Sequence, residues 1–168
     1  MPQITRKSTK PPLLKLNFIS HGTLEARDLQ ASRCFYEEVM GFEVLQRTPV
    51  SLLLRLGGDH TYVVVQTRNP KGMTLLNHNG VDVSTEDDVR AAYEALFSVQ
   101  DDYGIEQVRK PRWQHGVFSF YVTDPDGNWW EILANRPRGY APGFDEPAAD
   151  LTGRTDLSHE QLRGASPL

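Results

Sequence analysis

One segment of the chain occurs twice, and this repeat limits the possible folds more than any other feature of the sequence. The copies read HGTLEARDLQASRCFY and HNGVDVSTEDDVRAAY, and each runs from a histidine to a tyrosine over the same spacing, His21 to Tyr36 and His78 to Tyr93. A glycine and an apolar residue follow each copy, as Gly41-Phe42 and Gly104-Ile105. Two copies of one unit are expected to pack about a pseudo-two-fold axis, which would bring their opening histidines together.

The first unit has the pattern of a strand, a helix and three further strands. Apolar and polar residues alternate from Leu13 to Ala26, which predicts a strand with one face on a core. Asp28 is a candidate N-cap for the helix behind it, because its carboxylate can accept the free amides of a first turn. Three short apolar runs separated by turn residues then predict strands at 42–47, 51–56 and 61–67.

The second unit repeats this order. A strand is expected at 77–83, and Ser84 or Thr85, followed three residues later by Asp87 or Asp88, resembles a capping box at the start of a helix. Three more strands follow, the last two joined by an Asp-Pro-Asp-Gly turn; they are expected at 105–109, 117–123 and 129–134.

These patterns predict an α+β fold in which two paired βαβββ modules form one curled mixed sheet with helices on its convex face. The expected organisation is an extended arm at 1–12, a domain at 13–135 with modules at 13–68 and 77–135, and a C-terminal tail at 136–168. The tail is rich in proline, glycine and charge, with a short helix expected at 159–163.

Three side chains of this repeat are candidate metal ligands. When Asp59 is aligned with Asp126, Val64 falls opposite Glu131, so the repeat offers His21, His78 and Glu131 and lacks a fourth ligand. Strand alternation places the three on the face opposite the helices. An isolated carboxylate there would be costly to keep ionised, and a cation held with two imidazoles would offset that cost. Two histidines and a carboxylate suit Fe(II) first, and also Mn(II), Zn(II) or Ni(II).

Other readings of these residues remain open. A single inward histidine is more often a hydrogen-bonded core residue than a ligand, although two at equal repeat positions favour a metal. Tyr121 lies on the same face as Glu131, where it can contact a substrate or simply pack the sheet. His115 can act in proton transfer or stand in a solvated loop.

Composition excludes several classes of protein. A formal net charge of −4 argues against nucleic acid as a partner. No apolar run is long enough for a signal peptide or a membrane span. The single cysteine, Cys34, forms no intramolecular disulfide and fits a reducing compartment. We therefore expect a cytoplasmic protein with a small-molecule substrate and no membrane partner.

Three stretches resemble the vicinal oxygen chelate superfamily, also called the glyoxalase/bleomycin-resistance/dioxygenase fold. They are HGTLEARDLQASRCFYEEVMGFEVL, NHNGVDVSTEDDVRAAYEAL and FSFYVTDPDGNWWEIL. The resemblance spans roughly 13–135 and implies metal ligation by His21, His78 and Glu131. It also implies a substrate contact for Tyr121, as in extradiol dioxygenases, and an acid–base role for His115, whose spacing departs from the pattern.

The resemblance implies a metal-dependent oxidoreductase like the ring-cleaving, extradiol-type dioxygenases, acting on a small substrate with two vicinal oxygens. Relatives that isomerise glutathione hemithioacetals use four protein ligands, and Val64 stands where the fourth is expected. The alternatives are a non-redox metalloenzyme (a thiol transferase, isomerase or epimerase) or a protein that sequesters an antibiotic. Because the chain is shorter than two-domain extradiol enzymes, one catalytic domain in a homodimer is expected.

Overall fold

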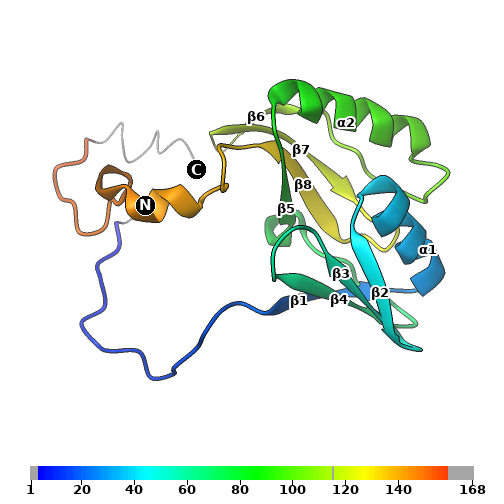
Figure 1. The fold of residues 1–168 in the computed structure, drawn as a ribbon. Coiled ribbons are helices and arrows are strands. Elements are labelled where there is room, and N and C mark those ends of the chain that lie inside the picture. The colour runs from blue at the N-terminus through cyan, green and yellow to red at the C-terminus, as the bar shows by residue number, and fades with distance from the viewer. Residues whose placement is uncertain (1–3, 115, 159–168) are drawn as a thin grey trace.

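The computed structural model describes residues 4–114 and 116–158, and it confirms the α+β fold with two βαβββ modules (Figure 1). The strands form two four-stranded mixed sheets with the orders β1-β4-β3-β2 and β5-β8-β7-β6. The strands of the first are β1 (His21–Ala26), β2 (Glu43–Thr48), β3 (Ser51–Arg55) and β4 (Thr61–Gln66). Those of the second are β5 (Asn79–Val83), β6 (Arg112–Gln114), β7 (Val117–Thr123) and β8 (Trp129–Ala134).

Both modules pair their strands in the same way. In each, the first strand lies parallel to the last, and the remaining neighbours are antiparallel. The ladder pairs Thr23 with Val63 in the first module and Gly80 with Glu131 in the second. The sequence repeat is therefore a structural repeat, and equivalent positions can be read from the ladders.

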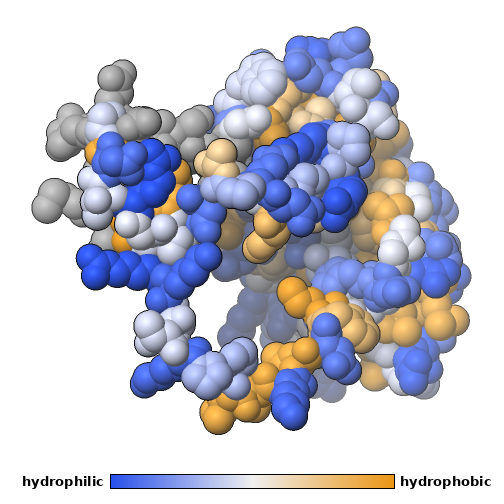
Figure 2. Space-filling view, turned by 60° about the vertical axis from the view of Figure 1, so that its left-hand side comes forward, coloured by the Kyte–Doolittle hydropathy of each residue, from blue (hydrophilic) through white to orange (hydrophobic). Residues whose placement is uncertain are grey.

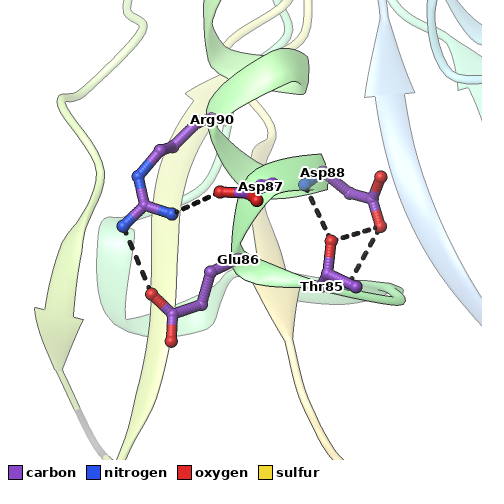
Figure 3. Close-up of polar contacts among 5 residues, drawn as sticks. All are labelled: Thr85, Glu86, Asp87, Asp88 and Arg90. Carbon is purple, nitrogen blue, oxygen red and sulfur yellow. Dashed lines mark hydrogen bonds and ion pairs between the residues drawn. The ribbon is translucent and has the colours of Figure 1, made fainter.

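Helix α1 (Leu29–Cys34) covers the first sheet and continues as a π-helical turn, Phe35–Val39, while α2 (Glu86–Val99) covers the second. As expected, Asp28 caps α1 by accepting hydrogen bonds from two first-turn amides. A capping box begins α2: Thr85 accepts from the Asp88 amide and Asp88 accepts from the Thr85 amide, as Figure 3 shows. Arg90 bridges two first-turn carboxylates on the same helix.

A single apolar core joins the helix-covered faces of the two sheets. Trp130 of β8 is fully buried and lies edge-on to Tyr36 and Phe42 of the first module. Within this core, Tyr36 donates a hydrogen bond of 2.5 Å to Asp124, whose carboxylate also receives the side-chain amide of Asn128 at 2.7 Å. The helix-side packing thus fixes the two modules against each other.

The linker between the modules is anchored at its middle. The Met73 amide donates to the carbonyl of Gly127, in the turn between β7 and β8, at 3.0 Å. Gly72 has a φ of +62°, and a Cβ at this position would lie 2.8 Å from the same carbonyl oxygen. Only glycine fits this approach without strain. After the anchor, a 3-10 turn at Leu75–Asn77 leads directly to His78 and β5.

The N-terminal segment differs from the expectation. Strand β1 begins at His21, whereas the alternation predicted a strand from Leu13. Residues 13–20 form no ladder with any described part of the chain, although the segment is strongly apolar. The arm instead reaches toward the tail, where the Gly153 amide donates to the Thr5 carbonyl and Lys7 lies 3.9 Å from Asp150. Hydrogen-bonded partners define a strand, and pattern alone does not supply them.

Two short 3-10 turns, Ala141–Asp145 and Pro147–Ala149, belong to the tail. The helix expected at 159–163 lies outside the described residues. Within the described ranges, no helix has the length and apolar character to cross a bilayer.

Candidate metal centre

The candidate site lies on the face of the second sheet that points away from the helices. Glu131 of β8 is paired with Gly80 of β5 and with Tyr121 of β7, so the three form one row across the sheet. Their neighbours Trp130 and Val122 point the other way, into the core. The expected placement of Glu131 and Tyr121 on the open face is therefore confirmed.

His78 and Glu131 form the centre of this site. His78 Nε2 lies 3.2 Å from Glu131 Oε2, and Glu131 is only 6% exposed. The other ring nitrogen, Nδ1, lies 2.6 Å from the carbonyl of Leu75 and must donate to it. If His78 is neutral, its only N–H is therefore on Nδ1, and Nε2 carries a lone pair that points at Glu131 Oε2. Two hydrogen-bond acceptors, Nε2 and Oε2, then face each other. A proton or a cation is needed between them.

A metal ion fits this pair. The observed separation of 3.2 Å between Nε2 and Oε2 is short enough for both atoms to ligate one ion. The Leu75 carbonyl fixes the ring in the tautomer that leaves Nε2 free to ligate, as metal-bound histidines require. Imidazole nitrogen and carboxylate oxygen are a donor set for borderline divalent ions such as Fe(II).

A chain of hydrogen bonds orients the carboxylate. Ser119, which is fully buried, donates to Glu131 Oε1 at 2.6 Å and accepts from the Gln114 side-chain amide at 2.7 Å. The 2.6 Å length of the Ser119–Glu131 bond is typical of a charge-assisted O–H···O⁻ bond. Because the serine proton is donated to Oε1, the second oxygen of Glu131, Oε2, is left for His78. Ser119 and Gln114 therefore position Glu131.

Tyr121 borders the pair. Its ring lies edge-on to that of His78 with centroids 4.9 Å apart. Burial, followed by the Glu131 carboxylate, raises the pKa of Tyr121 to about 12. The phenol is therefore neutral at physiological pH and can donate a hydrogen bond to an anionic or carbonyl oxygen at this site.

The tail brings further groups toward the same face. Burial and then the nearby Glu131 raise the pKa of Tyr140, with Asp82 contributing less. The pKa of Asp82 is raised by burial and then by Glu131. Gly139 lies so close to Asp82 that a Cβ there would be 3.1 Å from the carboxylate. The tail thus lies beside the mouth of the site.

His21 does not join the other two candidate ligands within one chain. It stands on the exposed face of β1, in the first sheet, and its Nδ1 lies 2.8 Å from the Ser20 hydroxyl. Among residues 4–114 and 116–158, no three His, Cys, Asp or Glu side chains are grouped as a metal would require. The described residues of one chain thus bring two donors together, His78 and Glu131, and His21 is not grouped with them.

The ladders correct the expected position of the missing fourth ligand. Because His21 and His78 are equivalent, Thr23 corresponds to Gly80, and their ladder partners Val63 and Glu131 correspond to each other. Val64, which the alignment of Asp59 with Asp126 had indicated, is in the core and 1% exposed. A one-residue shift in a strand reverses the face, so the turn aspartates were poor anchors for the alignment. Val63 is also aliphatic, and the absence of a fourth carboxylate at this position stands.

Three other features lie away from the site or outside the described residues. His115 lies outside the described residues, so its expected catalytic role stays a prediction. Trp113 pairs with Phe118, whose ring receives Arg90 of α2, so both lie on the helix side and away from the site. An apolar hollow of about 360 Å³ also lies on the helix side, lined by Val81, Leu96 and Ile132 among others, and does not include the His78–Glu131 pair.

Sequence reasoning missed Ser119, Gln114, Asp82 and Tyr140. The signal for Ser119 was available, because it precedes Tyr121 by two residues on the same strand and must share its face. Gln114 followed from the short β6–β7 hairpin once Ser119 was identified. Tyr140 carried no local signal, since its approach depends on how the tail folds back.

Comparisons with known proteins bear on the family and the fold. The family model for the Glyoxalase/Bleomycin resistance protein/Dioxygenase superfamily matches residues 18–132. A catechol-2,3-dioxygenase of Bacillus subtilis (strain 168) is 29% identical over 132 residues, which cover 71% of this chain and 42% of that protein. The chain therefore spans less than half the length of this curated relative.

Solved structures share the fold. A glyoxalase-related enzyme from Fulvimarina pelagi is 28% identical with a TM-score of 0.55, covering 71% of this chain and 89% of that one. A lactoylglutathione lyase from Agrobacterium tumefaciens is 21% identical with a TM-score of 0.53, covering 77% and 99%. At the latter identity the likeness concerns the fold alone.

Proposed function

Because the chain belongs to the glyoxalase/bleomycin resistance protein/dioxygenase superfamily, we propose that it is a metal-dependent oxidoreductase resembling the ring-cleaving, extradiol-type dioxygenases. Its substrate is a small compound with two vicinal oxygens, such as a catechol. The observation that carries the proposal is the His78–Glu131 pair, whose Nε2 and Oε2 atoms lie 3.2 Å apart and need a proton or a metal cation between them. The similarity to a catechol-2,3-dioxygenase favours this chemistry within the superfamily.

The chain's own groups have distinct roles in this proposal. His78 and Glu131 would hold the ion, with Fe(II) as the favoured metal and Mn(II), Zn(II) or Ni(II) compatible with the same donors. When bound, such an ion supplies positive charge that lowers the pKa of substrate hydroxyls. Tyr121 donates a hydrogen bond to a substrate oxygen, since its raised pKa keeps the phenol protonated. Trp129 and Leu133, buried on the same strand face as Glu131, keep this side of the sheet apolar.

The non-redox alternatives use the same ion without oxygen. The pairing of Val63 with Thr23 leaves no carboxylate at the first-module position equivalent to Glu131, which weighs against the four-ligand isomerase. A thiol transferase needs no fourth ligand. It is therefore the alternative that activity measurements must distinguish from the dioxygenase. Antibiotic sequestration is disfavoured, because it needs neither the oriented His78 nor the Ser119–Glu131 bond.

The test is oxygen uptake after anaerobic loading with Fe(II), measured over a panel of catechols. We expect uptake in the wild type and its loss in Glu131→Gln and His78→Ala, with metal content measured on each. Glu94→Gln is the matched control, because Glu94 is exposed on α2. Absence of uptake with every diol, together with thiol-dependent turnover in the presence of Mn(II), would replace the proposal by the transferase.

We further propose that the protein is cytoplasmic and forms a homodimer. It binds neither nucleic acid nor a membrane. A net charge of −4 and a single cysteine support the location and the absence of a polyanionic partner.

A further inference from the structure

Two arginines, Arg109 and Arg112, lie on the open face of the second sheet, beside the candidate metal site. The ladder pairs Arg112 of β6 with Ser119 of β7, so Arg112 is on the face where Ser119 donates to Glu131. The guanidinium of Arg109 lies over the ring of Trp129, 4.9 Å from the ring centroid. Trp129 and Glu131 are two residues apart on β8 and therefore share a face.

Contacts with the open face hold both arginines in place. Because β6 is an edge strand, charged side chains on it could serve only to keep other strands from pairing with the sheet. Arg112, however, donates through Nε to Gln114 Oε1 at 2.8 Å, and Gln114 belongs to the hydrogen-bond chain described above. Arg109 is held against Trp129 by cation–π attraction. Lys110, which is exposed between them and forms no hydrogen bond or ion pair with the described residues, fits the edge-strand role.

Neither arginine has a carboxylate partner. Within residues 4–114 and 116–158, no Asp or Glu side chain forms an ion pair with Arg109 or Arg112. The bond to Gln114 uses only the Nε proton of Arg112, so the terminal N–H groups of its guanidinium can still bind an acceptor. A planar guanidinium matches a carboxylate, with which arginine forms paired hydrogen bonds. The two side chains are thus donors for an anion that the described chain does not supply.

The charges on either side of Glu131 determine which way such an anion would point. On β5, the Asp82 carboxylate would repel it, and burial followed by the charge of Glu131 raises the pKa of Asp82. On the other side, burial raises the pKa of Tyr121, and Arg112 is near enough to oppose this rise. Neighbouring strands lie about 4.8 Å apart, so β6 lies about 10 Å from the strand of Glu131. This separation is the span of one substituted aromatic ring.

We propose that the substrate carries a carboxylate and that Arg109 and Arg112 bind it. The substrate class is then a small aromatic vicinal diol with an acidic substituent remote from its two oxygens, such as 3,4-dihydroxybenzoate. The inference rests on the proposed function, because the ion held by His78 and Glu131 would bind the diol end of this molecule. The arginines bind the other end and act as specificity residues.

A small molecule can reach this face. The arm and the tail lie on the side of the molecule away from α1 and α2 (Figure 1), and Figure 2 shows a hollow between these two segments and the body of the protein. Both arginines are exposed, so an anionic group that approaches from solvent meets them without a rearrangement of the sheet.

The first test compares two ligands that differ in charge but little in shape, 3,4-dihydroxybenzoate and 3,4-dihydroxybenzamide. Each is titrated by calorimetry, without oxygen, into the Mn(II)-loaded wild type. We expect the acid to bind at least about tenfold more tightly than the amide, because hydrogen bonds between charged groups are the stronger ones. The preference should decrease as the salt concentration rises, since salt screens exposed charges. Equal affinities for the acid and the amide would overturn the inference.

Substitutions test whether the two arginines cause the preference. Arg109→Gln and Arg112→Gln should each weaken binding of the acid by about tenfold and leave binding of the amide within about twofold. Lys110→Gln is the matched control, because it removes the same charge from the same exposed segment, and it should keep the wild-type preference.

A second control separates charge from positioning. Because Arg112 also holds Gln114, Mn(II) content is measured on every variant, and Arg112→Lys, which keeps the charge, should retain most of the preference for the acid. A double variant, Arg109→Gln with Arg112→Gln, that still favours the acid as strongly as the wild type would refute the assignment.

Binding preference and turnover distinguish this inference from the proposed reaction. A preference for the acid that depends on both arginines, without oxygen uptake after Fe(II) loading, would leave the carboxylate site standing and remove the dioxygenase. Oxygen uptake with the same kcat/KM on the acid and the amide would keep the dioxygenase and remove the carboxylate site. If neither compound bound, the carboxylate site would fail together with the diol site.

Discussion

The substitution Ser119→Ala isolates the hydrogen bond that orients Glu131. The serine is fully buried and its hydroxyl lies 2.6 Å from Oε1, so its removal leaves a carboxylate oxygen without a donor and the Gln114 amide without an acceptor. A hydrogen bond to a charged group contributes about 1.5–3 kcal/mol. The loss of an orienting partner in a metal site typically lowers metal affinity by about 10–100-fold.

These two magnitudes agree, because a factor of ten in affinity corresponds to about 1.4 kcal/mol. We therefore expect Ser119→Ala to bind Mn(II) or Fe(II) about 10–100-fold more weakly in competition with a chromophoric chelator. Ser119→Thr, which keeps the hydroxyl, should recover part of the affinity if the larger side chain is accommodated.

The control is Ser32→Ala. Ser32 is 1% exposed, and its hydroxyl donates to the Asp28 carbonyl at 3.0 Å, with the Asp126 carboxylate further away at 3.4 Å. It belongs to α1, which covers the first sheet. The substitution should reduce the free energy of unfolding without changing metal affinity. Equal metal affinities for Ser119→Ala and the wild type would refute the reasoning, because Glu131 would then be oriented by something other than this bond.

Three further predictions follow from other contacts. Asp124→Ala removes the acceptor of the Tyr36 hydroxyl and of one Asn128 side-chain N–H in the core, and it should lower the free energy of unfolding in urea by about 3 kcal/mol or more; Glu94→Ala, at an exposed position on α2, should change it by less than about 0.5 kcal/mol. Thr85→Ala removes the side-chain cap of α2 and should cost about 1 kcal/mol in the same assay, whereas Ser98→Ala, an exposed position in the last turn of α2, should not. Tyr121 holds its proton more tightly when folded, with a pKa of about 12 against 10.0, so unfolding free energy should fall as pH rises from 10 to 12; Tyr121→Phe should show a shallower fall, and identical slopes would argue against the raised pKa.

The repeat was enough to predict the fold, because each module is defined by local signals. Alternation gives the faces of the strands, and Asp28 and Thr85 cap their helices through contacts that lie within a few residues. Glu131 could be assigned to a buried position because apolar residues surround it in sequence. The same logic of alternation correctly put Tyr121 beside it.

What failed to follow from the sequence depends on contacts between distant segments. The repeat predicted that the two histidines would meet, but packing through Trp130 and Tyr36 on the helix side left His21 on a separate exposed face. The one-residue difference between Val63 and Val64 could be settled only by a ladder, since Asp59 lies two residues before β4 whereas Asp126 lies three residues before β8. Tyr140 depends on the fold of the tail, which carries no periodic pattern.

The hydrogen bond between the Met73 amide and the Gly127 carbonyl also helps to fix the distance between His78 and Glu131. Gly127 lies in the turn that precedes β8, the strand of Glu131. The linker continues from Met73 into the 3-10 turn, where the Leu75 carbonyl accepts a hydrogen bond from the His78 ring. His78 and Glu131 are thus both held by the linker and the β7–β8 hairpin. A movement of one module relative to the other would leave the distance between them unchanged. His21, on β1 of the first sheet, is not held by these contacts, so its distance from His78 and Glu131 would change in such a movement.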